Sequence, residues 1–220
     1  MLQNQGQCNP CYVLHLPQSL IWGGGLRLPT FIFLALSATA QTQYFADVGV
    51  GSQYYNATTA MYGLKITSGC LEAPARFCPT DNLTRGQMAV FIIRAWSLRL
   101  WGDPEAFRTY APPSGNPYFA DLTNTSDFQF PYVQKMLELG ITNGCLTGPL
   151  RFCPWDTALN AHIAVFTTRA RTLSDSQCTS PCSVDGFQNS PSPYFSDVPQ
   201  GHDFFKWIQR LADLGAVSTC

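Results

Sequence analysis

One short pattern occurs three times in this chain, about 75 residues apart. Tyr44-Phe-Ala-Asp-Val48 returns as Tyr118-Phe-Ala-Asp-Leu122 and again as Tyr194-Phe-Ser-Asp-Val198. A Gly-Cys pair, an Arg-Phe-Cys-Pro segment and an apolar Ala-Val-Phe segment follow each of the first two copies. Self-similarity at a fixed period is typical of modular arrays, in which each repeat is one supersecondary unit. Repetition favours a binding or anchoring surface over a catalytic centre, because linked weak contacts add up.

The third copy ends early. Cys220 stands where Cys70 and Cys145 stand in the first two copies, and no second cysteine, proline or apolar segment follows it. We therefore expect a truncated product with two complete repeats and one partial repeat. Such a product should be marginally stable or oligomeric, because the apolar face around Phe205, Ile208 and Leu211 would lack part of its covering.

Composition narrows the function classes. The chain has 220 residues, a formal net charge of −1, 12% charged residues and 45% hydrophobic residues. The hydrophobic content supports a folded core. A nucleic-acid-binding protein needs a basic face, and this balance argues against one. Low charge together with many Ser, Thr, Asn, Gln and Tyr residues favours an exported surface protein.

The N-terminal region 1–40 has the pattern of a leader. An apolar run at about 28–38 follows Arg27 and ends in Ala38-Thr39-Ala40, which is typical of a signal-peptide cleavage site. A buried core strand is the alternative. The run is too short to span a bilayer comfortably, so we expect no transmembrane segment in the mature protein. A misassigned start codon would explain the long segment 1–25, and Cys8 and Cys11 would then be irrelevant to the mature chain.

The cysteines form repeated pairs. Cys70 and Cys78 enclose seven residues, and Cys145 and Cys153 enclose seven residues at the same place in the second copy. In an exported chain each pair predicts a disulfide, which in a loop of this size stabilises by roughly 2–3 kcal/mol. Zinc would need two more ligands per site, and the three histidines do not repeat with the cysteines. We also expect Cys178 to pair with Cys182 and Cys220 to stay unpaired.

Periodicity predicts two helices in each repeat. Phe130, Val133, Leu137 and Ile141 share one helical face before the second cysteine loop, and Phe205, Ile208 and Ala212 do so in the third copy. After the first loop, Met88, Phe91, Ile92 and Ala95 follow at i, i+3, i+4 and i+7. Each complete module is therefore predicted to be a helix, a stapled loop and a helix.

Polar residues at the helix starts have a structural explanation. Thr84 and Gln87 have the spacing of a capping box, in which each side chain bonds the backbone of the other residue. Asp47, Asp121 and Asp197 are expected to cap or turn the chain before the first helix of each repeat.

Taken together, the pattern resembles the S-layer homology (SLH) repeat. The features that carry the resemblance are Phe-x-Asp-Val, an apolar helix, Gly-Ile-x-x-Gly, Phe-x-Pro and Thr-Arg-x-Gln-x-Ala, over residues 44–98, 118–172 and 194–220. The closest likeness is to the cysteine-containing variety in exported bacterial proteins. The resemblance implies an all-α fold of helix–loop–helix repeats in a pseudo-threefold arrangement. It also implies non-covalent binding of cell-wall polysaccharide, or of a polymer associated with peptidoglycan, at the cell surface.

The resemblance also places a ligand site. The family's Thr-Arg-x-Glu motif corresponds to Thr84, Arg85 and Gln87, and its turn glycine corresponds to Gly69. Its arginine contacts anionic sugar groups, and a guanidinium offers paired planar donors for a carboxylate. The alternative for Arg85 is a purely structural place at a solvated helix end. The second copy has Leu159, Asn160 and His162 at these positions, so we expect a degenerate second site.

The expected organisation follows from these matches. A leader (1–40) precedes repeat 1 (41–98), a linker (99–117), repeat 2 (118–172), a Ser/Pro-rich linker (173–193) and partial repeat 3 (194–220). The predicted function is a non-catalytic envelope anchor without cofactor or metal. The alternative is a surface-layer assembly module that self-associates through its aromatic residues. An enzyme using Asp47 or Asp121 with His162 is disfavoured, because the aspartates repeat with the scaffold and no catalytic motif is present.

Overall fold

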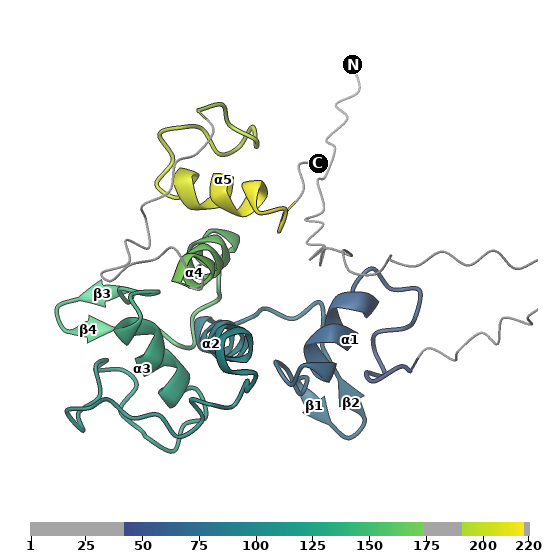
Figure 1. Cartoon of the computed structure of the whole chain (residues 1–220), viewed down its shortest axis with the longest axis horizontal. Coiled ribbons are helices and arrows are strands. Elements are labelled where there is room, and N and C mark those ends of the chain that lie inside the picture. Colours follow the sequence, from purple (N-terminus) through teal and green to yellow (C-terminus); the bar gives the residue numbers. More distant parts are fainter. Residues whose placement is uncertain (1–41, 174–190, 218–220) are drawn as a thin grey trace, which may run out of the picture.

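The computed structural model describes residues 42–173 and 191–217, which form five helices and two small sheets (Figure 1). In chain order the elements are α1 (Tyr55–Gly63), β1 (Leu71–Glu72), β2 (Ala75–Arg76), α2 (Arg85–Trp101), α3 (Phe130–Glu138), β3 (Leu146–Thr147), β4 (Leu150–Arg151), α4 (Asn160–Leu173) and α5 (Phe205–Asp213). The predicted leader and the Cys178/Cys182 pair lie outside the described residues, as do Cys8, Cys11 and Cys220. None of the described helices is long and apolar enough to cross a membrane.

The expectation of an all-α fold is wrong, because each cysteine loop is a β-hairpin. β1 pairs antiparallel with β2, and β3 pairs in the same way with β4. The predicted disulfides are confirmed: Cys70–Cys78 and Cys145–Cys153 both have Cα atoms 6.0 Å apart. Because each disulfide holds the ends of its loop together, the short segment between the cysteines folds back on itself and satisfies its backbone groups by cross-strand pairing.

The aspartates of the repeated pattern hold these hairpins in place. Asp47 accepts hydrogen bonds from the backbone N–H groups of Phe77 and Cys78, at 2.9 and 2.7 Å. Asp121 does the same for Phe152 and Cys153, again at 2.9 and 2.7 Å. These two aspartates therefore fix the end of the hairpin rather than cap the helix that follows, since α1 and α3 each begin eight or nine residues later.

The main core is built from repeat 2 and the second helix of repeat 1. Most of the predicted face is buried: Phe130 is 3% exposed, and Val133 on α3 and Ile141 just after it are each 0% exposed. Leu137 of the same face is only half-buried, and the neighbouring Met136, at 0% exposed, lies in the core instead. The aromatic residue of the repeated pattern packs on the hairpin, with the rings of Phe119 and Phe152 5.4 Å apart. Repeat 1 has a much smaller cluster of its own, formed by Phe45, Val48 and Tyr55 with Ala75 and Phe77 packed against it.

Helices of successive repeats pack against each other. α2 packs on α3, α4 packs on α5, and α2 packs on α4 (Figure 1). No other described helix packs on α1, which stands to one side with its hairpin (Figure 1). The expected pseudo-threefold arrangement is therefore also wrong for the described residues, because no described helix packs on α1 as α2 packs on α3 and α4 packs on α5.

Candidate ligand-binding groove

A groove of about 500 Å³ lies where the start of α2 meets repeat 2 and α5. Its walls come from all three copies of the repeat. The lining residues are Arg85, Thr142, Asn143, Gly144, Cys145, Asp156, Thr157, Leu159, His162, Val165, Phe166, Arg169, Phe204 and Trp207. Polar groups and aromatic rings thus converge in one concave space, as is usual for small-ligand sites.

The capping box predicted at the start of α2 is confirmed. The Thr84 hydroxyl accepts a hydrogen bond from the backbone N–H of Gln87 at 3.2 Å, and the Gln87 side chain accepts one from the Thr84 N–H at 2.9 Å. Neither residue lines the groove. Their role in the structure is to fix the direction in which the chain enters α2, and so the position of Arg85 between them.

The same segment is joined to repeat 2 by backbone hydrogen bonds. Arg85 N–H donates to the carbonyl of Asp156 at 2.9 Å, and the Ala158 N–H donates to the carbonyl of Leu83 at 2.8 Å. Between them lies an antiparallel bridge of Thr84 with Thr157. The first turn of α2 is therefore attached to the following repeat rather than to its own.

Arg85 is buried between the start of α2 and repeat 2, with 4% of its surface exposed. Its Nε–H donates to the carbonyl of Phe152 at 3.0 Å, and its guanidinium lies 4.9 Å from the Phe152 ring centre and 5.4 Å from that of Phe166. Its buried Nη2 makes no hydrogen bond with any described residue. A buried donor without a partner is uncommon and calls for an explanation.

Burial affects the protonation of two groups in the groove. Burial lowers the pKa of the Arg85 guanidinium, and the carboxylates of Asp156 and Asp121 act in the opposite direction. Burial also lowers the pKa of His162, and the nearby positive charge of Arg85 adds to this effect. Because His162 Nδ1 accepts a hydrogen bond from the Leu159 N–H at 3.3 Å, the neutral imidazole fits this position.

The partial third copy supplies an aromatic wall. The Phe204 ring lies 6.1 Å from His162 and 6.3 Å from Trp207. The Arg169 guanidinium lies 5.3 Å from the Trp207 ring centre. Thr168 on α4 donates its hydroxyl hydrogen to the Trp207 carbonyl at 3.3 Å, which links α5 to α4.

Of the four residues expected at a ligand site, the structure brings only Arg85 to this groove. Gly69 lies in the turn of repeat 1, where its φ of +94° and the close approach of the Arg76 carbonyl, which any Cβ would overlap, require a glycine. Gly144 is the matching residue of repeat 2, and it does line the groove. The arginine of one repeat thus meets the turn of the next. In the second copy Asn160 is exposed, in keeping with the loss of the cation there.

Sequence reasoning missed the residues that come from other repeats. Asp156, Phe204, Trp207 and Arg169 carry no motif of their own. The repeat period could have indicated one of the groove residues. Gly144 lies one repeat after Gly69, and it lines the same groove as Arg85.

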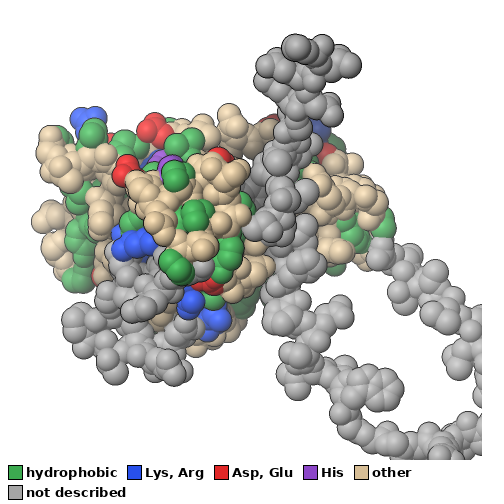
Figure 2. Space-filling model, turned by 90° about the horizontal axis from the view of Figure 1, so that it is seen from above, with side chains coloured by type: hydrophobic (Ala, Val, Ile, Leu, Met, Phe, Trp, Pro, Cys, Tyr) green, Lys and Arg blue, Asp and Glu red, His purple; other side chains and the backbone are tan. Residues whose placement is uncertain are grey.

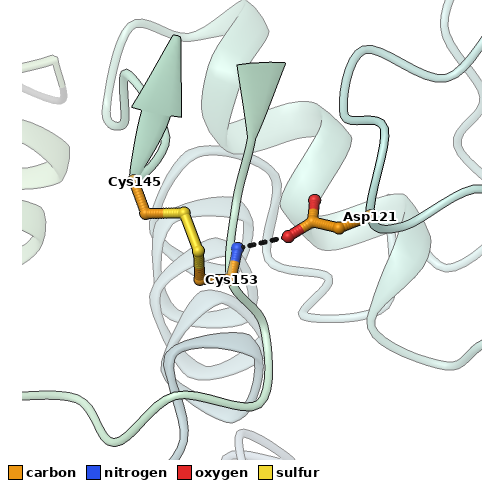
Figure 3. Close-up of side chains that lie close together, drawn as sticks. All are labelled: Asp121, Cys145 and Cys153. Atoms are coloured by element: carbon orange, nitrogen blue, oxygen red, sulfur yellow. Dashed lines mark hydrogen bonds between the residues drawn. A yellow bond between two sulfur atoms is a disulfide. The ribbon is translucent and has the colours of Figure 1, made fainter. Parts of the chain in front are cut away.

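One further group of possible metal ligands lies beside the second hairpin. Asp121, Cys145 and Cys153 place their side-chain atoms within 4.8 Å of one another (Figure 3). The two sulfur atoms are joined in a disulfide, so neither is a thiolate, and the Asp121 carboxylate already accepts two backbone hydrogen bonds. These residues therefore explain the stability of the hairpin and do not form a metal centre in this state.

Comparison with protein-family models and with curated proteins found no match to this chain. The resemblance to SLH repeats therefore stays a prediction from the residues themselves.

Proposed function

We propose that this chain is a non-catalytic module that binds an anionic polysaccharide of the bacterial cell envelope, and that it acts outside the cytoplasm. The observation that carries the proposal is the buried Arg85, whose Nη2 has no partner among the described residues and which lines a groove with aromatic walls. A guanidinium binds carboxylates through paired planar donors, and aromatic faces suit the apolar faces of sugar rings.

The distribution of positive charge on the surface agrees with a small binding site rather than a broad basic face. The face seen in Figure 2 carries its Lys and Arg side chains in small separate groups among uncharged and hydrophobic ones, with no continuous basic area on the described part of that face. Two disulfides are stable in oxidising compartments outside the cytoplasm, which agrees with export.

An assembly module of a surface layer is the second candidate, because several large aromatic residues are exposed. Trp155 is 65% exposed, Phe128 61% and Trp101 55%. Tyr55 and Trp96 are instead buried, at 6% and 7%. Such a module would self-associate without any polymer.

Co-sedimentation of the oxidised protein with purified envelope sacculi separates these functions. We expect the protein to pellet with intact sacculi and to stay in solution after the attached polysaccharide has been extracted. Arg85→Ala should weaken pelleting, whereas Arg108→Ala, which removes an equal charge from an exposed site, should not.

Because Arg85 is buried, each variant must first show the thermal transition of the parent. Trp207→Ala, on the wall formed by the third copy, gives a second variant that does not disturb the α2 cap. A folded protein that never pellets would refute the anchor, and pelleting without sacculi would favour the assembly module.

A further inference from the structure

The turn between α3 and β3 contains the one Asn-Gly pair of the sequence, Asn143-Gly144 (Figure 1). Asn143 is exposed, and both residues line the groove that contains Arg85. The matching turn of repeat 1 has Ser68 before Gly69, with the same Ile-Thr before and the same Cys after. Asn143 is therefore the one difference between two otherwise identical turn sequences.

An asparagine that precedes a glycine can lose its side-chain amide without any enzyme. The backbone nitrogen of the glycine attacks Cγ of the asparagine, the amide nitrogen leaves as ammonia with the proton of that backbone N–H, and a cyclic imide forms. Water then opens the imide at one or the other of its carbonyl groups, which gives aspartate or isoaspartate. Glycine favours the first step because it has no side chain to keep its nitrogen away from Cγ.

The local structure leaves the backbone nitrogen of Gly144 accessible to this reaction. Among the described residues, its N–H donates only within its own turn, to the Thr142 hydroxyl at 3.1 Å. The hydrogen bonds of the hairpin begin one residue later, where the Cys145 N–H donates to the Arg151 carbonyl at 2.7 Å. A bond within one turn breaks by local opening, without unfolding of the helices. The folded protein can therefore bring the Gly144 nitrogen to Cγ of Asn143.

We propose that Asn143 is a site of spontaneous deamidation, and that its conversion to aspartate or isoaspartate weakens the binding of an anionic ligand in the groove. Either product adds a carboxylate to the groove in which Arg85 is the buried cation. The new charge joins that of Asp156, which also lines the groove, and repels a bound anion. The loss of binding rests on the proposed envelope anchor, whereas the deamidation itself does not.

Isoaspartate also disturbs the turn, because it adds a methylene group to the main chain. The backbone has little room there: a Cβ on Gly144 would lie 2.4 Å from the Arg151 carbonyl oxygen and 3.2 Å from the Phe119 ring. The longer main chain should therefore displace the start of the second hairpin. Faster hydrogen exchange of the Cys145 amide would report this change without any ligand.

The test compares fresh oxidised protein with protein that has been aged at mildly alkaline pH. Mass spectrometry of the tryptic peptide 136–151 measures the conversion of Asn143, and methylation by an isoaspartate-specific enzyme identifies that product. We expect conversion at Asn143 before any at Asn82 or Asn124, which are exposed but do not precede a glycine. Full conversion should weaken pelleting with sacculi about two- to fivefold, as expected for one added charge at an exposed position.

Two variants separate the effect of the charge from other effects of ageing. Asn143→Asp carries the charge from the start, so the fresh variant should already show the weaker pelleting. Asn143→Ser introduces the residue of repeat 1 and has no amide to lose. Whatever its initial level of pelleting, that level and the exchange of its Cys145 amide should not change as the protein ages.

Three results would overturn the proposal. The first is an absence of conversion at Asn143, and the second is conversion no faster than at Asn82 and Asn124. The third is fully converted protein that pellets as well as fresh protein. Fresh protein that never pellets would instead refute the envelope anchor, and the mass of the peptide and the exchange of the Cys145 amide would then decide on the modification by themselves.

Discussion

The side chains of Asp47 and Asp121 each accept hydrogen bonds from two consecutive backbone N–H groups. In each complete repeat a single side chain therefore holds the end of the hairpin. For Asp47, burial alone would raise the pKa, but the N–H groups of Phe77 and Cys78, with Arg76 nearby, hold the pKa below its usual value. At both positions each carboxylate oxygen accepts one N–H.

Asp121→Asn should lower the free energy of unfolding by about 1–3 kcal/mol, because an amide has one acceptor oxygen and turns an NH₂ group toward the second N–H. Urea denaturation measures this loss. Asp197→Asn is the matched control, since Asp197 occupies the same repeat position but is exposed. Equal losses in the two variants would show that the N–H contacts contribute little.

The lowered pKa of His162 should make the stability of the protein depend on pH. Burial and Arg85 lower the pKa of His162 in the folded protein below the ordinary value of about 6.5. The unfolded chain then binds more protons than the folded one as the pH falls below about 6.5. Stability from this group is complete above the unfolded pKa and is lost as the pH falls through the lower pKa of the folded state.

His162→Gln should therefore show a smaller fall in melting temperature between about pH 7.5 and about pH 5 than the parent protein. Glutamine is the residue at the matching position of repeat 1, Gln87, and can keep the acceptor for the Leu159 N–H. Thermal scans at several pH values test this, and parallel profiles for the two proteins would exclude His162 as the source.

At the residue scale, the sequence predicted local contacts and missed those between repeats. The Thr84–Gln87 capping box and both disulfide pairs depend on residues close in the chain, and they are confirmed. Membership of one repeat predicts that Gly69 and Arg85 share a site. In the structure Arg85 lies beside Gly144 instead, because the segment around Arg85 bonds to the next repeat at Asp156, a contact between residues that no local motif links.

Among the elements, the two hairpins match closely but lie in different surroundings. The second hairpin begins just after Cys145, which lines the groove, whereas the first packs on the small cluster of Phe45, Val48 and Tyr55. Strands of two residues are too short to show an alternating pattern, which is why the sequence predicted only a stapled loop at both places.

Replacing both cysteines of either disulfide by serine should lower the free energy of unfolding by roughly 2–3 kcal/mol, because the two closed loops have equal length. The two double variants should differ in ligand binding. Cys145→Ser with Cys153→Ser should weaken pelleting with sacculi, while Cys70→Ser with Cys78→Ser should preserve it in folded protein. Equal pelleting by the two variants would count against the groove as the binding site.

Stability should be uneven across the whole molecule. α3 is covered by α2 and contributes to the main core, whereas α1 has only the small cluster packed against it within the described part of the chain. Amide exchange reports local opening, so α1 should exchange at least about tenfold faster than α3 under native conditions. Mass spectrometry of peptides that cover the two helices measures this difference. Similar rates would mean that repeat 1 opens only with the rest of the protein.

The bridge between Thr84 and Thr157 has a consequence for how such chains can be cut or extended. A recombinant fragment limited to the second repeat would keep its hairpin and helices but lose Arg85 and the aromatic wall of Phe204 and Trp207. The groove lies where repeats meet, so a duplication that inserts one repeat adds one junction of this kind. The shortest segment that keeps the whole groove must therefore run from Arg85 in the first repeat, through the second repeat, to Trp207 on α5.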